Sequence, residues 1–218
     1  MSEQWEDAHE RISLSRDFQR IPAGYGGRRV DLANDRLGID ADSDLNERAV
    51  HLLRPSSFDR VLEVGSGHGR AVARLANIVD KGCVCGIDVS ESMLNRAVRR
   101  NRRAVAAGRV QLRKGDCASI PFANANFDGA LAVHTVYFWR DPLACLSEIR
   151  RVLKPRARLV LGFLRGDSAH RNRFPNETAT FYGEQSVRTM LEACDFGSIR
   201  FSQIGEESLV LATATDRY

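Results

Sequence analysis

The sequence predicts an α/β fold built on a doubly wound, mostly parallel sheet. Short apolar runs, each long enough for one buried strand, alternate with segments whose apolar residues repeat at helical spacing. The first such pair is a strand over 60–64 followed by a helix through the seventies, and the pattern recurs along the chain. Strands that alternate with helices are typical of right-handed βαβ units, whose helices cover both faces of one sheet.

Each element has its own sequence signal. A helix starting at Asp42 or Ser43 has a regular apolar side and ends before Pro55. A second strand spans 83–87, and a helix over 91–107 is capped by Ser90 and stopped by Gly108. The later elements are strands over 110–113 and 127–133, a helix opened by Asp141 and Pro142, strand 158–164, a helix over 183–194, and closing strands 199–203 and 209–213.

Composition limits the class of protein. The 218 residues suffice for one sizeable core, and 43% hydrophobic with 28% charged residues is ordinary for a globular protein. No apolar run approaches the roughly 18 residues of a membrane span. The acidic first residues do not resemble a signal peptide, so we expect a cytoplasmic protein.

The cysteines predict reduced thiols. They are five in number and lie mostly inside predicted strands and helices, which argues against a disulfide framework. Cys83 and Cys85 share one face of their strand, but no second pair of ligands lies nearby, and we expect no metal. The cysteines are Cys83, Cys85, Cys117, Cys145 and Cys194.

Three glycines mark the first strand-to-helix turn. Gly65, Gly67 and Gly69 follow the apolar run 61–64, and glycine accepts positive φ and allows a ligand to approach the backbone. The helix that follows presents free N–H groups. A tight packing corner is the alternative explanation of these glycines.

Asp88 stands about twenty residues beyond the glycines, at the end of the second strand. A βαβ unit brings such a carboxylate beside the glycine loop, where it can accept hydrogen bonds from ribose hydroxyls. The alternative, that Asp88 only opens the next helix, is weaker because Ser90 is available as the N-cap.

The spacing Glu63-x-Gly65-x-Gly67-x-Gly69 departs from the dinucleotide fingerprint, which requires a small residue where Arg70 stands. It resembles motif I of the class I S-adenosylmethionine-dependent methyltransferases. Later segments that resemble the same family are 86–94, 115–117, 127–128 and 148–155. The resemblance, close over 56–165, implies a Rossmann-like seven-stranded sheet that ends in an antiparallel hairpin.

The resemblance implies S-adenosylmethionine as cofactor. Asp116 would take the adenine amino group and the Cys117 N–H a ring nitrogen, although Asp116 could instead only shape a turn, and Met93 could be a plain core residue. The implied cofactor-binding residues are Glu63, Gly65, Ser66, Gly67, His68, Gly69, Asp88, Val89, Met93, Asp116, Cys117 and His134.

The exit of the fourth strand, 134–139, should form the floor of the reaction site. His134 is the candidate base for an acceptor proton, or else it only packs near the cofactor. Tyr137 and Trp139 could stack on a substrate or belong to the core. Tyr25 could contact the substrate or be solvated.

The family resemblance also implies an N-terminal helical cap over 1–55 and a methyltransferase domain over 56–218. Arg156 and Ala157 stand where the family commonly has two glycines, so this turn should avoid strong positive φ. A segment at 30–35 is loosely similar to quinone-biosynthesis C-methyltransferases.

The predicted function is methyl transfer to a small, partly apolar or aromatic acceptor by a monomer or homodimer. The alternatives are an RNA methyltransferase and a non-catalytic cofactor-binding protein. Five arginines in 96–103 suggest RNA, but the same helix has an apolar stripe, so they suit its solvated face, and nucleic acid is not the expected partner.

Overall fold

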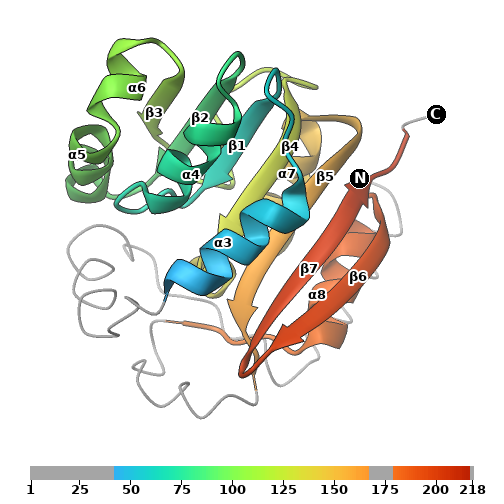
Figure 1. Cartoon of the computed structure of the whole chain (residues 1–218). Coiled ribbons are helices and arrows are strands. Elements are labelled where there is room, and N and C mark those ends of the chain that lie inside the picture. The colour runs from blue at the N-terminus through green and yellow to red at the C-terminus, as the bar shows by residue number, and fades with distance from the viewer. Residues whose placement is uncertain (1–41, 167–178, 217–218) are drawn as a thin grey trace.

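The computed structural model describes residues 42–166 and 179–216, and within them seven strands form one sheet (Figure 1). The strand order is β3-β2-β1-β4-β5-β7-β6, and only β7 runs antiparallel to its two neighbours. The doubly wound sheet with a closing antiparallel hairpin is thus confirmed. The strands are β1 (Arg60–Val64), β2 (Cys83–Asp88), β3 (Val110–Lys114), β4 (Phe127–Val133), β5 (Leu153–Leu164), β6 (Phe196–Ile204) and β7 (Glu207–Ala214).

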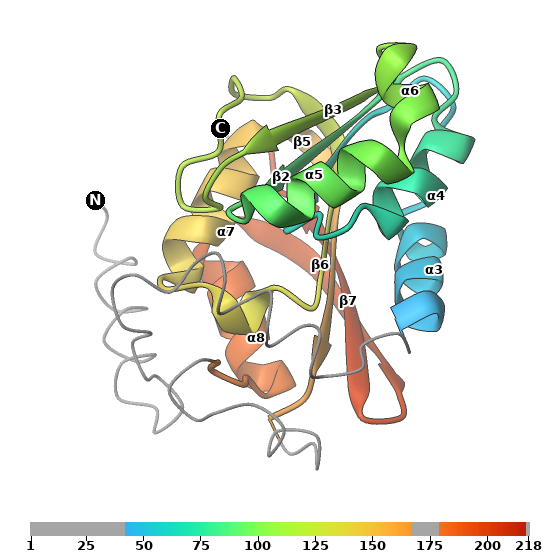
Figure 2. The ribbon, with the colours of Figure 1, turned by 90° about the vertical axis from the view of Figure 1, so that its left-hand side faces the viewer.

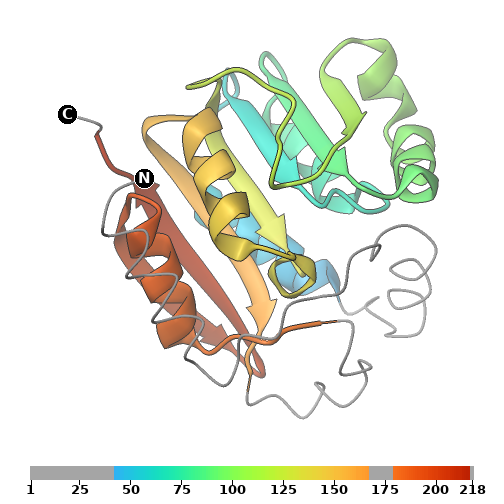
Figure 3. The ribbon, with the colours of Figure 1, turned by 180° about the vertical axis from the view of Figure 1, so that it is seen from behind.

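Helices cover both faces of the sheet. Figures 1 and 2 show α3, α4 and α5 on one side, and Figure 3 shows α7 and α8 on the other. Because both faces are covered, the central strands are mostly apolar, and Glu63 is a buried exception in β1. The helices are α3 (Asp42–Leu53), α4 (Arg70–Ile78), α5 (Glu91–Arg100), α6 (Arg102–Ala106), the 3₁₀ turn η2 (Val136–Phe138), α7 (Pro142–Val152) and α8 (Glu184–Ala193).

Alternate residues of each strand enter two separate cores. In β1, Leu62 and Val64 pack with α7 and α8, whereas Val61 packs with α3 and α4. This alternation follows from the two-residue repeat of a strand. The sheet is therefore held rigidly from both sides, which fixes the positions of the loops at its carboxyl edge.

Two predicted N-caps are confirmed. The Ser90 side chain accepts a hydrogen bond from the Met93 N–H at the start of α5, and Asp141 accepts one from the Ala144 N–H ahead of Pro142 in α7. Each cap satisfies one of the free N–H groups of a helix start. Local sequence signals thus determine where these helices begin.

The single helix predicted over 91–107 is wrong, because the chain breaks at Asn101 into α5 and α6. The buried Asn101 amide donates hydrogen bonds to the carbonyl oxygens of Gly69, at 3.0 Å, and Ala97, at 2.9 Å. The break therefore ties this helical segment to the glycine loop, a tertiary contact that helical periodicity does not reveal.

The prediction for the turn before the main part of β5 is also wrong. Arg156 has φ of 63° although it is not glycine. The backbone thus keeps the left-handed conformation that glycine adopts most easily, and arginine occupies it at a cost of about 1–2 kcal/mol. The packing of this turn therefore sets the φ of residue 156, and the preference of the arginine side chain does not.

The N-terminal cap predicted over 1–55 falls mostly outside the described residues, as does the segment 30–35, and the domain boundary at 55 stays a prediction. Among the described residues, no helix combines the length and apolar composition needed to cross a membrane.

Candidate active site

The glycine loop lies at the carboxyl end of β1 and is packed tightly. Gly65, Gly67 and Gly69 all have positive φ, of 72°, 49° and 78°. A Cβ on Gly65 would lie 2.2 Å from the Thr135 side chain, and one on Gly69 would lie 2.8 Å from the Cβ of Ala97. No described residue lies within 4 Å of where a Cβ on Gly67 would be, so this side of its backbone is open to a ligand. The loop therefore lies directly against the exit of β4 and against α5.

Asp88 holds the glycine loop to the end of β2. Its Oδ2 accepts a hydrogen bond from the Gly67 N–H at 2.7 Å, and its Oδ1 accepts one from the Ser90 N–H at 2.8 Å. A carboxylate has about four acceptor positions, so both oxygens can accept further bonds. Asp88 thus lies where the sequence places it, and its contact with ribose stays a prediction.

Within the described part of the chain, three buried polar atoms around this loop have no hydrogen-bond partner: Glu63 Oε2, Ser66 Oγ and Thr135 Oγ1. Burial, together with the nearby charge of Asp88, raises the pKa of the Glu63 carboxyl well above its ordinary value, although a backbone hydrogen bond with Val72 opposes the shift. An unsatisfied buried polar group costs about 1–3 kcal/mol. Three of them at one loop indicate a site that a polar ligand completes.

His134 occupies the β4 exit in a left-handed conformation, with φ of 56°. Its Nδ1 lies 2.8 Å from the Tyr137 hydroxyl, and its Nε2 lies 3.3 Å from Oε1 of Glu207. The His134 N–H donates to the Gly162 carbonyl of β5 at 2.8 Å. Strained non-glycine residues are concentrated at functional sites, and this one borders the glycine loop through its neighbour Thr135.

Glu207 is the site residue that sequence reasoning missed. It is the first residue of β7 and pairs with Leu164, the last residue of β5. An antiparallel strand that follows a hairpin starts at the edge where its parallel neighbour ends. The position of Glu207 could have been predicted from the sequence. The turn between the predicted closing strands contains Glu206 and Glu207, and such a turn lies at the carboxyl edge of the sheet.

The aromatic residues expected to contact substrate are buried. Tyr137 is fully buried, stacks on Phe181 with ring centroids 5.2 Å apart, and meets Phe138 edge-on at 4.8 Å. Trp139 is 5% exposed. Their substrate contacts stay predictions, and Tyr25 lies outside the described residues.

The expected adenine side of the site is formed by the loop after β3 and by α5. Asp116 is exposed, and its Oδ1 accepts a hydrogen bond from the Ala118 N–H at 2.9 Å. Met93 is buried beneath this region, whereas Val89 is 41% exposed. His68 is half-buried in the glycine loop, and its carbonyl oxygen accepts a hydrogen bond from Arg100 Nε at 3.0 Å. Their cofactor contacts stay predictions.

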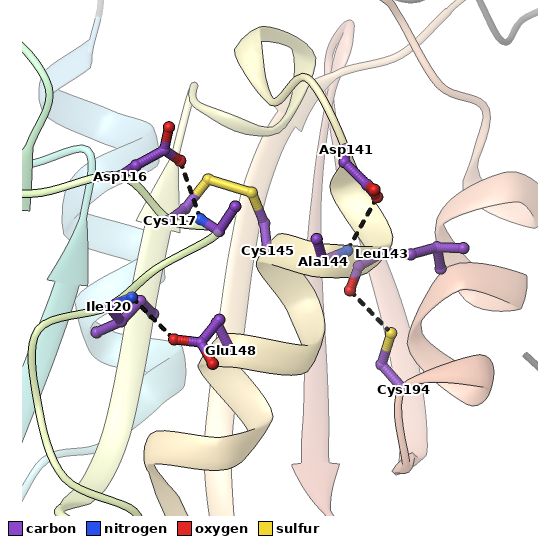
Figure 4. The surroundings of a disulfide bond; sticks show 10 residues. Asp116, Cys117, Ile120, Asp141, Leu143, Ala144, Cys145, Glu148 and Cys194 are labelled. Carbon is purple, nitrogen blue, oxygen red and sulfur yellow. Dashed lines mark hydrogen bonds between the residues drawn. A yellow bond between two sulfur atoms is a disulfide. The ribbon is translucent and has the colours of Figure 1, made fainter. Parts of the chain in front are cut away.

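The expectation of reduced thiols is wrong for two cysteines. Cys117 in the loop after β3 and Cys145 in α7 form a disulfide across a sequence separation of 28 residues (Figure 4). Glu148, one turn further along α7, accepts a hydrogen bond from the Ile120 N–H of the same loop at 2.9 Å. The loop beside Asp116 is therefore attached to α7 at two points.

The potential ligand atoms of Asp116, Cys117 and Cys145 lie within 4.8 Å of one another, which is close enough to hold one metal ion. The two sulfurs are bonded to each other, so they are not thiolate ligands in this state. Cys83 and Cys85 lie together as expected, with sulfurs 3.9 Å apart, but on a strand end remote from the glycine loop.

Residues 62–161 match a family model described as "Methyltransferase domain". An O-methyltransferase of Pyrenophora dematioidea is 33% identical over 135 residues, which are 62% of this chain and 47% of that protein. The ubiquinone/menaquinone biosynthesis C-methyltransferase UbiE of Syntrophotalea carbinolica is 31% identical over 144 residues, 66% of this chain and 58% of that protein.

The crystal structure of a SAM-dependent methyltransferase from Aquifex aeolicus superposes with a TM-score of 0.70 at 26% identity, covering 84% of this chain and 98% of that one. The alignments with the two curated relatives span about half of their length. The matched family model, the strand order of the sheet and the glycine loop after β1 all indicate the same type of domain. The chain thus contains a methyltransferase domain over residues 62–161 and is similar to S-adenosylmethionine-dependent methyltransferases in sequence and in fold.

Proposed function

We propose that the protein transfers a methyl group from S-adenosylmethionine to a small, partly apolar or aromatic acceptor. The observation that carries this proposal is the position of His134, whose ring lies between Tyr137 and Glu207 beside the glycine loop. The relatives that share the domain include proteins named as O-methyltransferases and a quinone C-methyltransferase.

The residues around the loop fit this cofactor. Asp88 has acceptor capacity for the ribose hydroxyls, and Glu63, with its partnerless Oε2, is suited to an ammonium or sulfonium charge. Ser66 and Thr135 add unsatisfied hydroxyls that suit the polar methionine end. When bound, S-adenosylmethionine supplies a methyl carbon that its sulfonium already activates, so the main task of the protein is to align the acceptor and exclude water.

His134 takes the proton of the acceptor through Nε2. The Nε2 contact with Glu207 is long, at 3.3 Å, and Glu207 is 28% exposed, so an acceptor can displace this carboxylate. Tyr137, fully buried, holds Nδ1 on the other side and fixes the ring. Glu207 then lies close enough to stabilise the imidazolium. This assignment makes Tyr137 and Glu207 positioning residues for His134.

The experiment is incubation of the purified protein with methyl-labelled S-adenosylmethionine and a panel of phenols, quinols and cell extract. We expect label in one small product, identified by mass. Cofactor binding in calorimetry without any labelled product would favour a non-catalytic cofactor-binding protein. Failure to bind the cofactor at all would contradict the proposal.

RNA methylation is the second candidate because Arg96, Arg99 and Arg100 are exposed on α5, and Arg100 contacts the glycine loop. On the same helix Met93, Leu94 and Ala97 are buried. This is what we expect if the arginines only form the solvent-exposed face of an amphipathic helix. Tight, steeply salt-dependent binding of RNA would favour RNA as the acceptor. Weak binding that is insensitive to sequence would favour the small acceptor.

We further propose that the protein acts in the cytoplasm as a monomer or homodimer. Light scattering after size-exclusion chromatography tests the oligomeric state, and localisation of the tagged protein in its own cell tests the compartment.

A further inference from the structure

A cavity of about 240 Å³ lies at the amino edge of the sheet, away from the glycine loop. It is bordered by the end of α3 and by the starts of β1, β4 and β5, including Val61 and Gly129. The glycine loop follows the opposite end of β1, about 15 Å away at the rise of an extended strand. The cavity is therefore separate from the methyl-transfer site.

Three arginines border the cavity: Arg54, Arg156 and Arg158. Arg158 donates a hydrogen bond from Nη1 to the Leu53 carbonyl at 3.2 Å. Among the described residues, the guanidinium groups of Arg54 and Arg156 form no hydrogen bond or ion pair, and both side chains are exposed. Two guanidinium groups at one cavity are thus available to a ligand.

The two acidic residues at the cavity are already engaged. Asp128 Oδ2 accepts a hydrogen bond from the Arg60 N–H at 2.9 Å, and its Oδ1 lies 2.5 Å from Lys154 Nζ. Asp59 Oδ2 accepts a hydrogen bond from the Ser56 N–H at 2.7 Å. With Lys154 compensating Asp128, the charge around the cavity is positive.

Both partnerless arginines occupy backbone positions that favour glycine. Arg54, just after α3, has φ of 50°, and Arg156 has φ of 63°. Glycine would adopt either conformation at less steric cost. Two strained arginines that border the same cavity indicate that the arginines are kept for this cavity rather than for the turns.

We propose that this cavity binds a phosphate or pyrophosphate group. Guanidinium groups match phosphate oxygens in charge and in bidentate geometry. The volume accommodates a diphosphate, and the cavity is open to solvent at the arginine side chains. The proposal does not depend on the methyl-transfer activity.

The test uses inorganic pyrophosphate and phenyl phosphate, titrated separately into the full chain and followed by calorimetry and thermal unfolding. We expect pyrophosphate to raise Tm by about 3–5 °C at about ten times its dissociation constant. Binding of pyrophosphate alone would identify a free diphosphate as ligand, and binding of both probes would identify the phosphate group of an organic ester. Sulfate at matched ionic strength controls for general salt stabilisation.

Arg54→Gly and Arg156→Gly are the decisive variants, because glycine relieves the left-handed backbone and the fold is retained. Each should keep or raise the Tm of the protein without ligand and lower the affinity for pyrophosphate at least tenfold. Ala125→Gly is the matched control, since exposed Ala125 also has positive φ, of 48°, but lies outside the cavity. It should bind pyrophosphate like the wild type. Unchanged affinity in both arginine variants, or no binding by the wild type, would overturn the proposal.

Discussion

At the residue scale, the site is defined by a few side chains in unfavourable states. Glu63 is a buried carboxyl group whose Oε2 has no hydrogen-bond partner among residues 42–166 and 179–216, and His134 has a left-handed backbone. Each state lowers the stability of the protein without ligand by an amount of order 1 kcal/mol or more. Proteins keep such residues where a ligand or a reaction uses them, so both residues yield direct tests.

His134→Asn should lower kcat by about 10²–10⁴, the usual contribution of a general base. Asparagine tolerates the left-handed conformation, so the backbone at the β4 exit should be kept. Steady-state kinetics with the identified acceptor measure kcat, and calorimetry measures the affinity for S-adenosylmethionine, which we expect to change less than about tenfold. Glu207→Gln should lower kcat less than His134→Asn and should alter the pH dependence of kcat. An unchanged kcat in His134→Asn would show that His134 is not the general base.

Glu63→Gln should make the protein more stable at pH 8 and leave stability at pH 4 unchanged. The pKa of Glu63 is higher in the folded state than in the unfolded state. The contribution of Glu63 to the free energy of unfolding is therefore fully present below the unfolded-state pKa, and it is lost as pH rises through the folded-state pKa. Removing the charge should raise Tm at pH 8 by about 2–4 °C per kcal/mol recovered. Cofactor affinity should fall in the same variant.

Thermal unfolding across pH measures this effect, with Glu148→Gln as a control of opposite sign. Hydrogen bonding to Arg151 lowers the pKa of Glu148 in the folded state. The contribution of Glu148 to the free energy of unfolding is therefore present above the unfolded-state pKa, and it is lost as pH falls through the folded-state pKa. Glu148→Gln should therefore lose stability at pH 8. A Glu63→Gln curve parallel to the wild-type curve at every pH would contradict the raised pKa.

At the element scale, the site depends on contacts between elements that are distant in sequence. The disulfide joins the loop after β3 to α7, and Asn101 joins the break between α5 and α6 to the glycine loop. The disulfide holds the expected adenine side of the site against α7 (Figure 4), and Asn101 holds the α5–α6 segment against the glycine loop. The loops at the carboxyl edge are consequently fixed by helices, not only by the strands they follow.

Cys145→Ser should lower the free energy of unfolding by about 3–4 kcal/mol under non-reducing conditions, the chain-entropy value for a loop of this length. We also expect weaker binding of S-adenosylmethionine, because Asp116 adjoins Cys117. Denaturant unfolding and calorimetry measure the two effects. Dithiothreitol should produce the same changes in the wild type and none in Cys145→Ser, and Cys83→Ser should behave like the wild type. Wild-type stability that does not respond to the reductant would contradict the bond.

At the scale of the whole molecule, the two ends of the sheet have different character. The carboxyl edge carries the glycine loop, His134 and Glu207, and the amino edge carries the arginine-lined cavity. The antiparallel β6–β7 hairpin completes the first of these by supplying Glu207, so the C-terminal part of the fold contributes to the proposed chemistry.

Arg150 links this C-terminal part to helix α7. It is 3% exposed, and it donates hydrogen bonds from Nε to the Asp195 carbonyl, at 3.2 Å, and from Nη2 to the Thr215 carbonyl. Arg150→Met should lower the free energy of unfolding by about 1–3 kcal/mol, because carbonyl groups lose a charged donor. Denaturant unfolding measures this loss. Arg188→Met, on the more exposed side of α8, should lower the free energy of unfolding by less. An equal loss in both variants would contradict the proposal that Arg150 stabilises the C-terminal part through its buried hydrogen bonds.

The sequence alone determined most of the elements and the cofactor motif. Strands Arg60–Val64 and Phe127–Val133 and the caps Ser90 and Asp141 appear where local patterns predicted them, because strand periodicity and capping depend on residues within a few positions. The glycine spacing and Asp88 likewise lie within one βαβ unit, whose handedness fixes their proximity.

Only the tertiary structure decided the remaining features of the site. The Cys117–Cys145 bond, the contact of Glu207 with His134, and the left-handed Arg156 each depend on how distant elements pack. No local pattern encodes such contacts, because the partners are separated by whole elements and their distance is set by the strand order β3-β2-β1-β4-β5-β7-β6. The physical reason is that packing of the helices against both sheet faces, rather than local propensity, selects these conformations.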